Sequence, residues 1–301
     1  MIDLRNATIK IENSTLCNAN CIMCPRDEFN FHGQVMSLKC FIKLVDESYS
    51  LGCRRMILGG FGEPLLDNNL GTRLRYVKNT YIDYTISLIT TGYALRGEVL
   101  DDVCEFIDVI KLSNYGYSPD VYESVHRGKL HYDTINENIS GLLCRKSRPY
   151  TIMTFLVVKE NEHEVEQWKQ HYEHIADRID IWKPHNWGGL INTNKKGQFT
   201  PCRRALSLSD LTFSADGSVV LCCFDFNRKL RIGNITEQSL EAIINGDKCG
   251  KLQYLHRDKS IVNSNLLCAS CDQLYDRTDS LIYTSNINMQ VGKNSMQDFK
   301  E

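Results

Sequence analysis

Three cysteines near the start of the sequence have the spacing of a metal-binding loop. Cys17, Cys21 and Cys24 form a C-x3-C-x2-C triplet after a short β-branched run. Three thiolates on one short loop can each bind an iron atom of a four-iron cluster and leave the fourth iron without a protein ligand. Such an open iron can bind a small molecule, as the open position of a catalytic zinc does. A zinc site is the alternative, but zinc prefers four ligands and His32 is the only histidine nearby.

Thirteen cysteines in 301 residues favour thiol or metal chemistry more generally. The N-terminus lacks a basic segment followed by an apolar one, so we expect no secretory signal and a reducing, cytoplasmic location. Cysteines there more often bind metals, react as thiols or pack as small apolar residues than form disulfides. The formal net charge of −2 gives no electrostatic support for nucleic-acid binding, and no apolar run is long enough to predict a membrane span.

The triplet must be positioned by the secondary structure around it. Along the chain, short β-branched or apolar runs alternate with amphipathic helical patterns. The expected strands cover residues 7–11, 55–58, 85–89, 109–112, 151–158 and 179–182. The expected helices cover residues 38–51, 66–77, 99–106, 132–143 and 165–175. This alternation predicts βαβ units with a parallel sheet and right-handed crossovers. Six units are too few to close an eight-stranded barrel, so we expect an α/β fold with an open, partial barrel.

A change in composition after the sixth strand predicts a second domain. We expect three parts: residues 1–195, residues 196–276, and a polar C-terminal tail at 277–301. The second part contains a predicted hairpin that turns at Asp216-Gly217, because this residue pair favours tight turns between strands.

A second motif, Gly60-Phe61-Gly62-Glu63-Pro64, follows the second expected strand. Together the two motifs resemble those of radical S-adenosylmethionine (SAM) enzymes, and the resemblance covers about residues 9–275. It implies a partial (β/α)6 barrel of the TIM type, in which a [4Fe-4S] cluster held by the triplet binds SAM. It also implies that the glycine–glutamate turn binds the amino group of SAM. Phe61 replaces a glycine that many members carry.

Three other residues match positions at which this family binds its cofactor. The resemblance implies that Met23 covers the adenine, that Ser113 binds the ribose, and that Thr91 belongs to the polar turn after the third strand. SAM and the reduced cluster would supply a 5′-deoxyadenosyl radical, while the protein directs that radical at one C–H bond and excludes water. An external one-electron reductant such as flavodoxin or ferredoxin is also implied.

Four C-terminal cysteines, Cys202, Cys222, Cys268 and Cys271, resemble the ligands of a shortened auxiliary-cluster domain. This twitch domain, a reduced form of the SPASM domain, implies one auxiliary [4Fe-4S] cluster in addition to the first. The C-x2-C pair of Cys268 and Cys271 taken by itself also suits zinc. Cys222 and Cys223 are alternatives as the ligand, and the spacing typical of the family favours Cys222.

The predicted reaction depends on Cys249. This residue and its neighbour Lys248 lie in a glycine-flanked segment between two expected helices. The chain resembles aminoglycoside epimerases of the neomycin type, which implies inversion of the sugar carbon C5‴, from neomycin C to neomycin B, with Cys249 returning the hydrogen atom. The alternative is a dehydrogenase that oxidises an aminocyclitol or sugar alcohol and passes an electron to the auxiliary cluster. A peptide-modifying maturase is less favoured, because the residues before Cys17 leave no room for a peptide-recognition domain.

A polycationic sugar substrate predicts acidic and aromatic side chains at the mouth of the barrel. We expect four residues to contact it, although each also suits a loop or core position: Tyr115, His185, Trp187 and Asp225. The other cysteines of the barrel are expected to pack as small apolar residues: Cys40, Cys53, Cys104 and Cys144.

Overall fold

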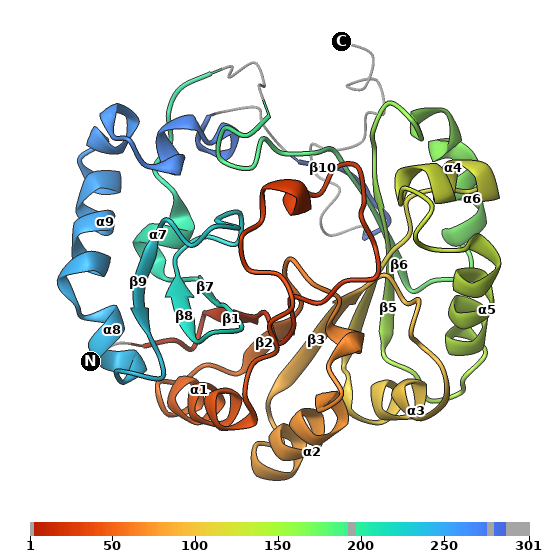
Figure 1. Ribbon diagram of the computed structural model, residues 1–301, viewed down its shortest axis with the longest axis horizontal. Helices are drawn as coiled ribbons and strands as arrows, with labels where there is room; N and C mark the ends of the chain where they lie inside the picture. Colours follow the sequence, from red (N-terminus) through yellow and green to blue (C-terminus); the bar gives the residue numbers. More distant parts are fainter. Residues whose placement is uncertain (1–2, 192–196, 276–279, 287–301) are drawn as a thin grey trace. The chain divides into compact units, whose positions relative to one another are not determined.

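A computed structural model describes residues 3–191, 197–275 and 280–286 of the chain (Figure 1). Strands and helices alternate as the sequence predicts. The strands are β1 (Thr8–Ile11), β2 (Arg55–Leu58), β3 (Thr85–Thr90), β4 (Val109–Ser113), β5 (Tyr150–Leu156), β6 (Arg178–Trp182), β7 (Asp210–Phe213), β8 (Ser218–Val220), β9 (Arg231–Asn234) and β10 (Leu281–Thr284).

The helices are α1 (Leu38–Ser50), α2 (Leu70–Thr80), α3 (Gly97–Phe106), α4 (Pro119–Val125), α5 (Tyr132–Leu143), α6 (Val165–Tyr172), α7 (Arg203–Ser207), α8 (Leu240–Ile244) and α9 (Asp247–Arg257). The bounds of α1, α3 and α5 lie within two residues of the predicted ranges. Within the described residues, no helix combines the length and the apolar character needed to cross a membrane.

The chain forms two compact units, which we call the first and second unit. The first contains the described residues of Met1–Leu16, Asp27–Ile86 and His185–Thr278. The second contains those of Cys17–Arg26, Ser87–Pro184 and Asp279–Glu301. This division differs from the expected boundary at residue 195, because β7 pairs with β1 and thereby joins the C-terminal segment to the start of the chain.

In the first unit the strands lie in the order β2-β1-β7-β8-β9. β1 pairs in parallel with β2 on one side and with β7 on the other, so that Ile9 faces both Met56 and Leu211 in register. β7 and β8 form the predicted antiparallel hairpin. Gly217 adopts the positive φ of 83° that this turn requires, and the carboxylate of Asp216 accepts the amide of Ser218 at 2.9 Å.

In the second unit the order is β10-β6-β5-β4-β3, with β3 contributing its residues from Ser87 onward. The strands β3 to β6 are parallel, and Figure 1 shows α4, α5 and α6 along one side of them. The expectation of a polar tail at 277–301 is wrong for residues 281–284, because they form β10, which pairs antiparallel with β6. The residues 276–279 and 287–301 lie outside the described part of the chain.

The mostly parallel strands and alternating helices confirm the predicted α/β fold. Parallel sheets present ligand-binding loops at the carboxyl ends of their strands. The predicted motifs follow β1, β2, β3 and β4 in sequence, so each begins at such an end.

Candidate active site

The cysteine triplet lies in the second unit, in the loop that follows β1. The amide of Cys24 donates to the carbonyl of Cys21 at 3.0 Å, which closes a tight turn. The amide of Ile22 donates to the carbonyl of Val125 at 3.0 Å and attaches this loop to the end of α4. The side chains of Cys17, Cys21 and Cys24 are all partly exposed, so the loop offers three sulfur ligands.

Two polar residues at the end of β4, Ser113 in its last position and Tyr115 after it, lie beside this loop in the same unit. Burial raises the pKa of the Tyr115 hydroxyl, a hydrogen bond with Ser113 opposes the shift, and the thiols of Cys21 and Cys24 raise it further. The structure therefore places Ser113 and Tyr115 near the triplet. Met23, within the loop, is buried.

A side chain of α5 forms hydrogen bonds with the turn after β3, which contains Thr91. Nδ2 of Asn138 donates to the carbonyls of Gly92 and Tyr93 at 3.0 and 2.7 Å. Gly92 has a φ of +80°, and a Cβ atom on it would lie 3.0 Å from Leu112. Asn138 therefore fixes the turn that the sequence places at the cofactor, and an isolated asparagine in a helix gave no signal of this role.

Two glycines allow the turn after β2, in the first unit, to pack against the segment after β1. A Cβ atom on Gly62 would lie 2.1 Å from the carbonyl oxygen of Ser14, and one on Gly60 would lie 2.9 Å from Oε1 of Glu12. Real Cβ atoms do not approach other atoms this closely, so the glycines are a steric requirement of the turn.

Glu63 completes this turn as a buried carboxylate. It is 2% exposed, and its side chain accepts the amide of Leu65 at 3.1 Å, which caps the short 3-10 helix Pro64–Leu66. Its own amide donates to the carbonyl of Leu16 at 2.6 Å. The turn thus has a fixed backbone, as a site for a small zwitterionic ligand requires.

Four cysteines of the first unit line one cavity of about 440 Å³, which we call the thiol cavity. They are the predicted auxiliary ligands Cys202, Cys222, Cys268 and Cys271. Cys223 is not among the described residues that line this cavity, which favours Cys222 as the ligand. Leucines make up much of the remaining wall, at positions 221, 230, 252, 267 and 274.

The thiols in this cavity interact with one another. Burial, with a contribution from the thiol of Cys202, raises the pKa of Cys268 to about 12 and that of Cys271 to about 11. Burial also raises the pKa of Cys222 well above its usual value, with the neighbouring thiols of Cys223 and Cys268 contributing. Among the described residues, no three histidine, cysteine or carboxylate side chains converge as they would around a single metal ion. Four thiols that face a common apolar cavity fit a [4Fe-4S] cluster, whose four irons each take one thiolate.

A smaller pocket of about 270 Å³, which we call the aromatic pocket, shares a wall with the thiol cavity. Trp187, Phe226 and Asn227 line the aromatic pocket, and Phe224 and Leu267 line both cavities. The aromatic pocket and the thiol cavity therefore adjoin each other at these two side chains.

Ring contacts extend from this pocket to the turn after β2. The ring of Phe61 lies 5.7 Å from that of Trp187 and 6.1 Å from that of Phe226, measured between centroids. Trp187 also contacts His185 at 4.1 Å. Burial, together with the positive charges of Arg204 and Lys10, lowers the pKa of His185 to about 3, so His185 is neutral at physiological pH.

Asp225, a predicted substrate residue, lines the aromatic pocket, but its carboxylate is occupied by the backbone. It accepts the amides of Lys229 and Leu230 at 2.8 and 2.6 Å and is 5% exposed. These bonds hold the loop after Cys222. Asp225 therefore stabilises the backbone of this loop, a structural role that is common for loop aspartates.

The position of Cys249 differs from its sequence prediction. It lies inside α9, which begins at Asp247 after Gly246, and not in a segment between helices. Cys249 is fully buried, and it is not among the described residues that line the thiol cavity or the aromatic pocket. Cys40 and Cys53 are buried as expected, whereas Cys144 is exposed.

The fold and these two sulfur sites define an iron–sulfur enzyme of the radical SAM class. Residues 12–171 match the family model of the radical SAM superfamily, and residues 202–272 match the SPASM iron–sulfur cluster-binding domain. The chain belongs to the radical SAM superfamily, and its cofactors are SAM and [4Fe-4S] clusters.

Two curated relatives are GTP 3′,8-cyclases. The enzyme of Desulforamulus reducens is 28% identical over 173 residues, which cover 54% of this chain and 52% of that protein. A probable GTP 3′,8-cyclase of Methanococcus maripaludis is 39% identical over 81 residues, 27% of each chain. The chain therefore spans only about a quarter to a half of these relatives.

Solved structures share the fold at low sequence identity. BtrN in complex with AdoMet and 2-DOIA superposes with a TM-score of 0.61 and 19% identity, covering 90% of this chain and 94% of that one. SuiB of Streptococcus suis bound to the precursor peptide SuiA gives a TM-score of 0.68 and 12% identity, covering 91% of this chain and 70% of that one.

Proposed function

We propose that the protein is a radical SAM dehydrogenase that oxidises an alcohol carbon of a small polar molecule, such as a sugar alcohol or an aminocyclitol. SAM and its cluster supply a carbon radical that removes a hydrogen atom from the substrate, and the auxiliary cluster supplies an electron acceptor. Loss of that hydrogen atom, of the hydroxyl proton and of one electron converts the alcohol to a ketone. An external flavodoxin or ferredoxin would provide the starting electron.

The observation that carries this proposal is the wall shared by the two cavities. Phe224 and Leu267 line both the aromatic pocket and the thiol cavity, so a substrate in the aromatic pocket lies next to the predicted electron acceptor. Trp187 and Phe226 provide flat apolar faces on which the C–H faces of a sugar ring can pack, and they exclude water from it.

Epimerisation from neomycin C to neomycin B, with Cys249 as donor, is the competing function from the sequence resemblance. It needs a thiol that faces the substrate carbon. Cys249 is fully buried in α9 and outside the described linings of both cavities, which favours oxidation over hydrogen return.

Turnover of a panel of aminoglycosides, aminocyclitols and GTP in deuterated water tests the proposal. We expect a ketone product without solvent deuterium at the reacting carbon, and we expect the Cys249→Ala variant to keep this activity. An inverted product that carries one deuterium, lost in Cys249→Ala, would establish the epimerase instead. Turnover of GTP would contradict both functions and favour the reaction of the curated relatives.

A further inference from the structure

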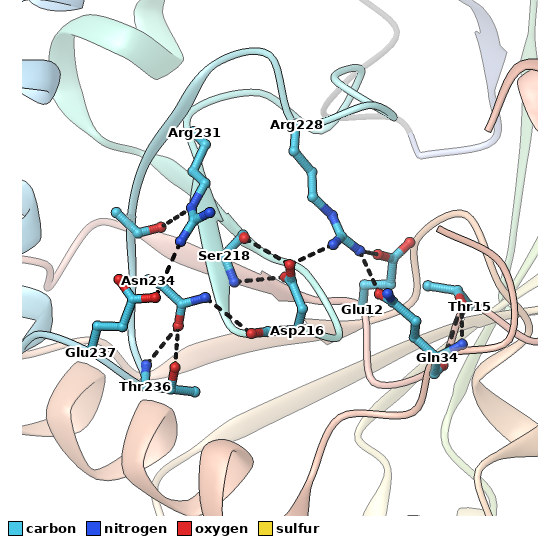
Figure 2. Close-up of polar contacts among 11 residues, drawn as sticks. Glu12, Thr15, Gln34, Asp216, Ser218, Arg228, Arg231, Asn234, Thr236 and Glu237 are labelled. Carbon is cyan, nitrogen blue, oxygen red and sulfur yellow. Dashed lines mark hydrogen bonds and ion pairs between the residues drawn. The ribbon is translucent and has the colours of Figure 1, made fainter. Parts of the chain in front are cut away.

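A buried arginine connects the loop of a predicted cluster ligand with the turn after β2. The side chain of Arg228 is 5% exposed, and its Nη1 lies 2.7 Å from a carboxylate oxygen of Asp216. Its Nη2 lies 3.8 Å from Oε2 of Glu12 (Figure 2). Its guanidinium lies 3.6 Å from the ring centroid of Phe31. Breaking a buried ion pair leaves an uncompensated charge, so these contacts fix the arginine firmly.

Glu12 forms the end of this connection that reaches the turn. Its Oε1 accepts the amide of Phe61 at 2.9 Å, and the absence of a side chain at Gly60 makes room for it. Burial raises the pKa of Glu12, while the amide of Phe61 and the charge of Arg228 oppose that shift. The position of the Phe61 amide therefore depends on a carboxylate that Arg228 helps to hold in its charged form.

The loop of residues 222–228 forms the other end of this connection. The amide of Asp225 donates to the carbonyl of Cys222, and the amide of Arg228 donates to the carbonyl of Asp225, both at 3.2 Å. Arg228 has a φ of 57°, in the left-handed region that side chains other than glycine rarely adopt. Two consecutive turns and an unusual backbone conformation thus determine where the guanidinium lies relative to Cys222.

A further contact connects Arg228 with Gln34, which follows the triplet in sequence and pairs with Thr15 before it. Its Nη2 donates to Oε1 of Gln34 at 3.0 Å, as Figure 2 shows. The amide of Gln34 donates to the hydroxyl of Thr15 at 2.7 Å, and the amide of Thr15 donates to the carbonyl of Gln34 at 2.8 Å. Arg228 therefore contacts both segments of the first unit, at Glu12 and at Gln34, that support the predicted cofactor turn.

We propose that Arg228 is a positioning residue that couples the Cys222 loop to the turn expected to bind SAM, acting through Glu12. Binding of the auxiliary cluster at Cys222 fixes the loop, and the fixed loop holds Glu12 and the Phe61 amide in place. SAM therefore binds more tightly when the auxiliary cluster is present. This inference rests on the SAM site of the family and not on the proposed oxidation, so the two can fail separately.

Binding of SAM to the reconstituted protein, without substrate, tests the coupling. We expect Arg228→Gln to keep both clusters but to raise the Kd for SAM roughly 5- to 100-fold. Removal of the auxiliary cluster by Cys268→Ala with Cys271→Ala should weaken SAM binding in the wild-type background but add little in the Arg228→Gln background. Hydrogen exchange at the Phe61 amide should be faster in Arg228→Gln.

Arg231→Gln is the matched control, because Arg231 lies three residues further along, is 42% exposed and pairs with Glu237 at 3.7 Å (Figure 2). It should bind SAM as the wild type does. If Arg228→Gln does not fold, Glu12→Gln carries the same test, since its amide oxygen still accepts the Phe61 amide while its charge is lost. Wild-type SAM affinity in either variant, or additive effects of arginine and cluster loss, would overturn the coupling.

Discussion

The ring of Phe224 stacks on the imidazole of His185, with 3.7 Å between their centroids and 30° between their planes. The guanidinium of Arg204 lies 5.0 Å from the ring centroid of Phe224. Because Phe224 lines both cavities, these contacts hold a side chain that the aromatic pocket and the thiol cavity share.

Truncation of that wall should expose the auxiliary cluster. We expect Phe224→Ala to keep the cluster ligands but to release iron to a chelator several-fold faster than the wild type, because solvent access destabilises a buried cluster. Phe226→Ala is the control, since Phe226 lines the aromatic pocket and is not among the described lining of the thiol cavity. Equal rates of iron release from the two variants would show that Phe224 does not shield the cluster.

The adjacent pair Cys222 and Cys223 allows the ligand to be identified by iron content. Cys222 lines the thiol cavity with three other cysteines, so Cys222→Ala should reduce the iron of anaerobically reconstituted protein from about eight atoms to about four. Cys223→Ala should retain about eight. The reverse result would assign the ligand to Cys223.

The glycines of the turn after β2 predict a large difference between two glycine-to-alanine substitutions. A Cβ atom on Gly62 would overlap the carbonyl of Ser14, so Gly62→Ala must displace the turn and should abolish measurable SAM binding. Gly141 lies in α5 with no atom within 4 Å of its would-be Cβ, so Gly141→Ala should stabilise the fold by roughly 0.5–1 kcal/mol. Titration with SAM and thermal unfolding measure the two effects, and normal SAM binding by Gly62→Ala would contradict the steric argument.

Burial of His126 predicts a loss of stability in acid. Burial lowers its pKa to about 4, below the value near 6.5 expected in the unfolded chain. Between these values the unfolded state binds more protons, so stability is full above pH 6.5 and falls by roughly 3 kcal/mol as the pH drops to 4. In urea unfolding at pH 7 and pH 5, His126→Gln should show a smaller difference than the wild type. The exposed His174, changed to glutamine, should leave the difference unaltered, and an unchanged difference in His126→Gln would contradict the prediction.

The sequence predicted the features that depend on local patterns. The periodicity of apolar residues predicts the strands and helices, and turn chemistry predicts the Asp216-Gly217 hairpin. The spacing of the cysteines predicts where metal ligands lie. The sequence also favoured Cys222 over Cys223, and the lining of the thiol cavity agrees with that preference.

The features that depend on distant contacts were missed. No local signal pairs Glu12 with Arg228, because the ion pair arises only when β1 and the loop after β8 meet in the folded unit. The sequence predicts a tail at residues 281–284, since a four-residue strand is too short to show a pattern before its partner β6 is known. The glycines that flank Cys249 predict a loop, whereas Gly246 precedes α9 and Gly250 lies within it.

β1 is bordered on one side by β2 and on the other by β7, a strand that is made much later in synthesis. Until the ribosome has added Asp210–Phe213, one edge of β1 has no native partner, and an unpaired apolar strand edge is a template for aggregation. Contacts between segments so distant in sequence also form slowly. The nascent chain therefore passes through a vulnerable interval, and chaperone binding to β1 before the C-terminal half emerges would protect the yield of folded protein.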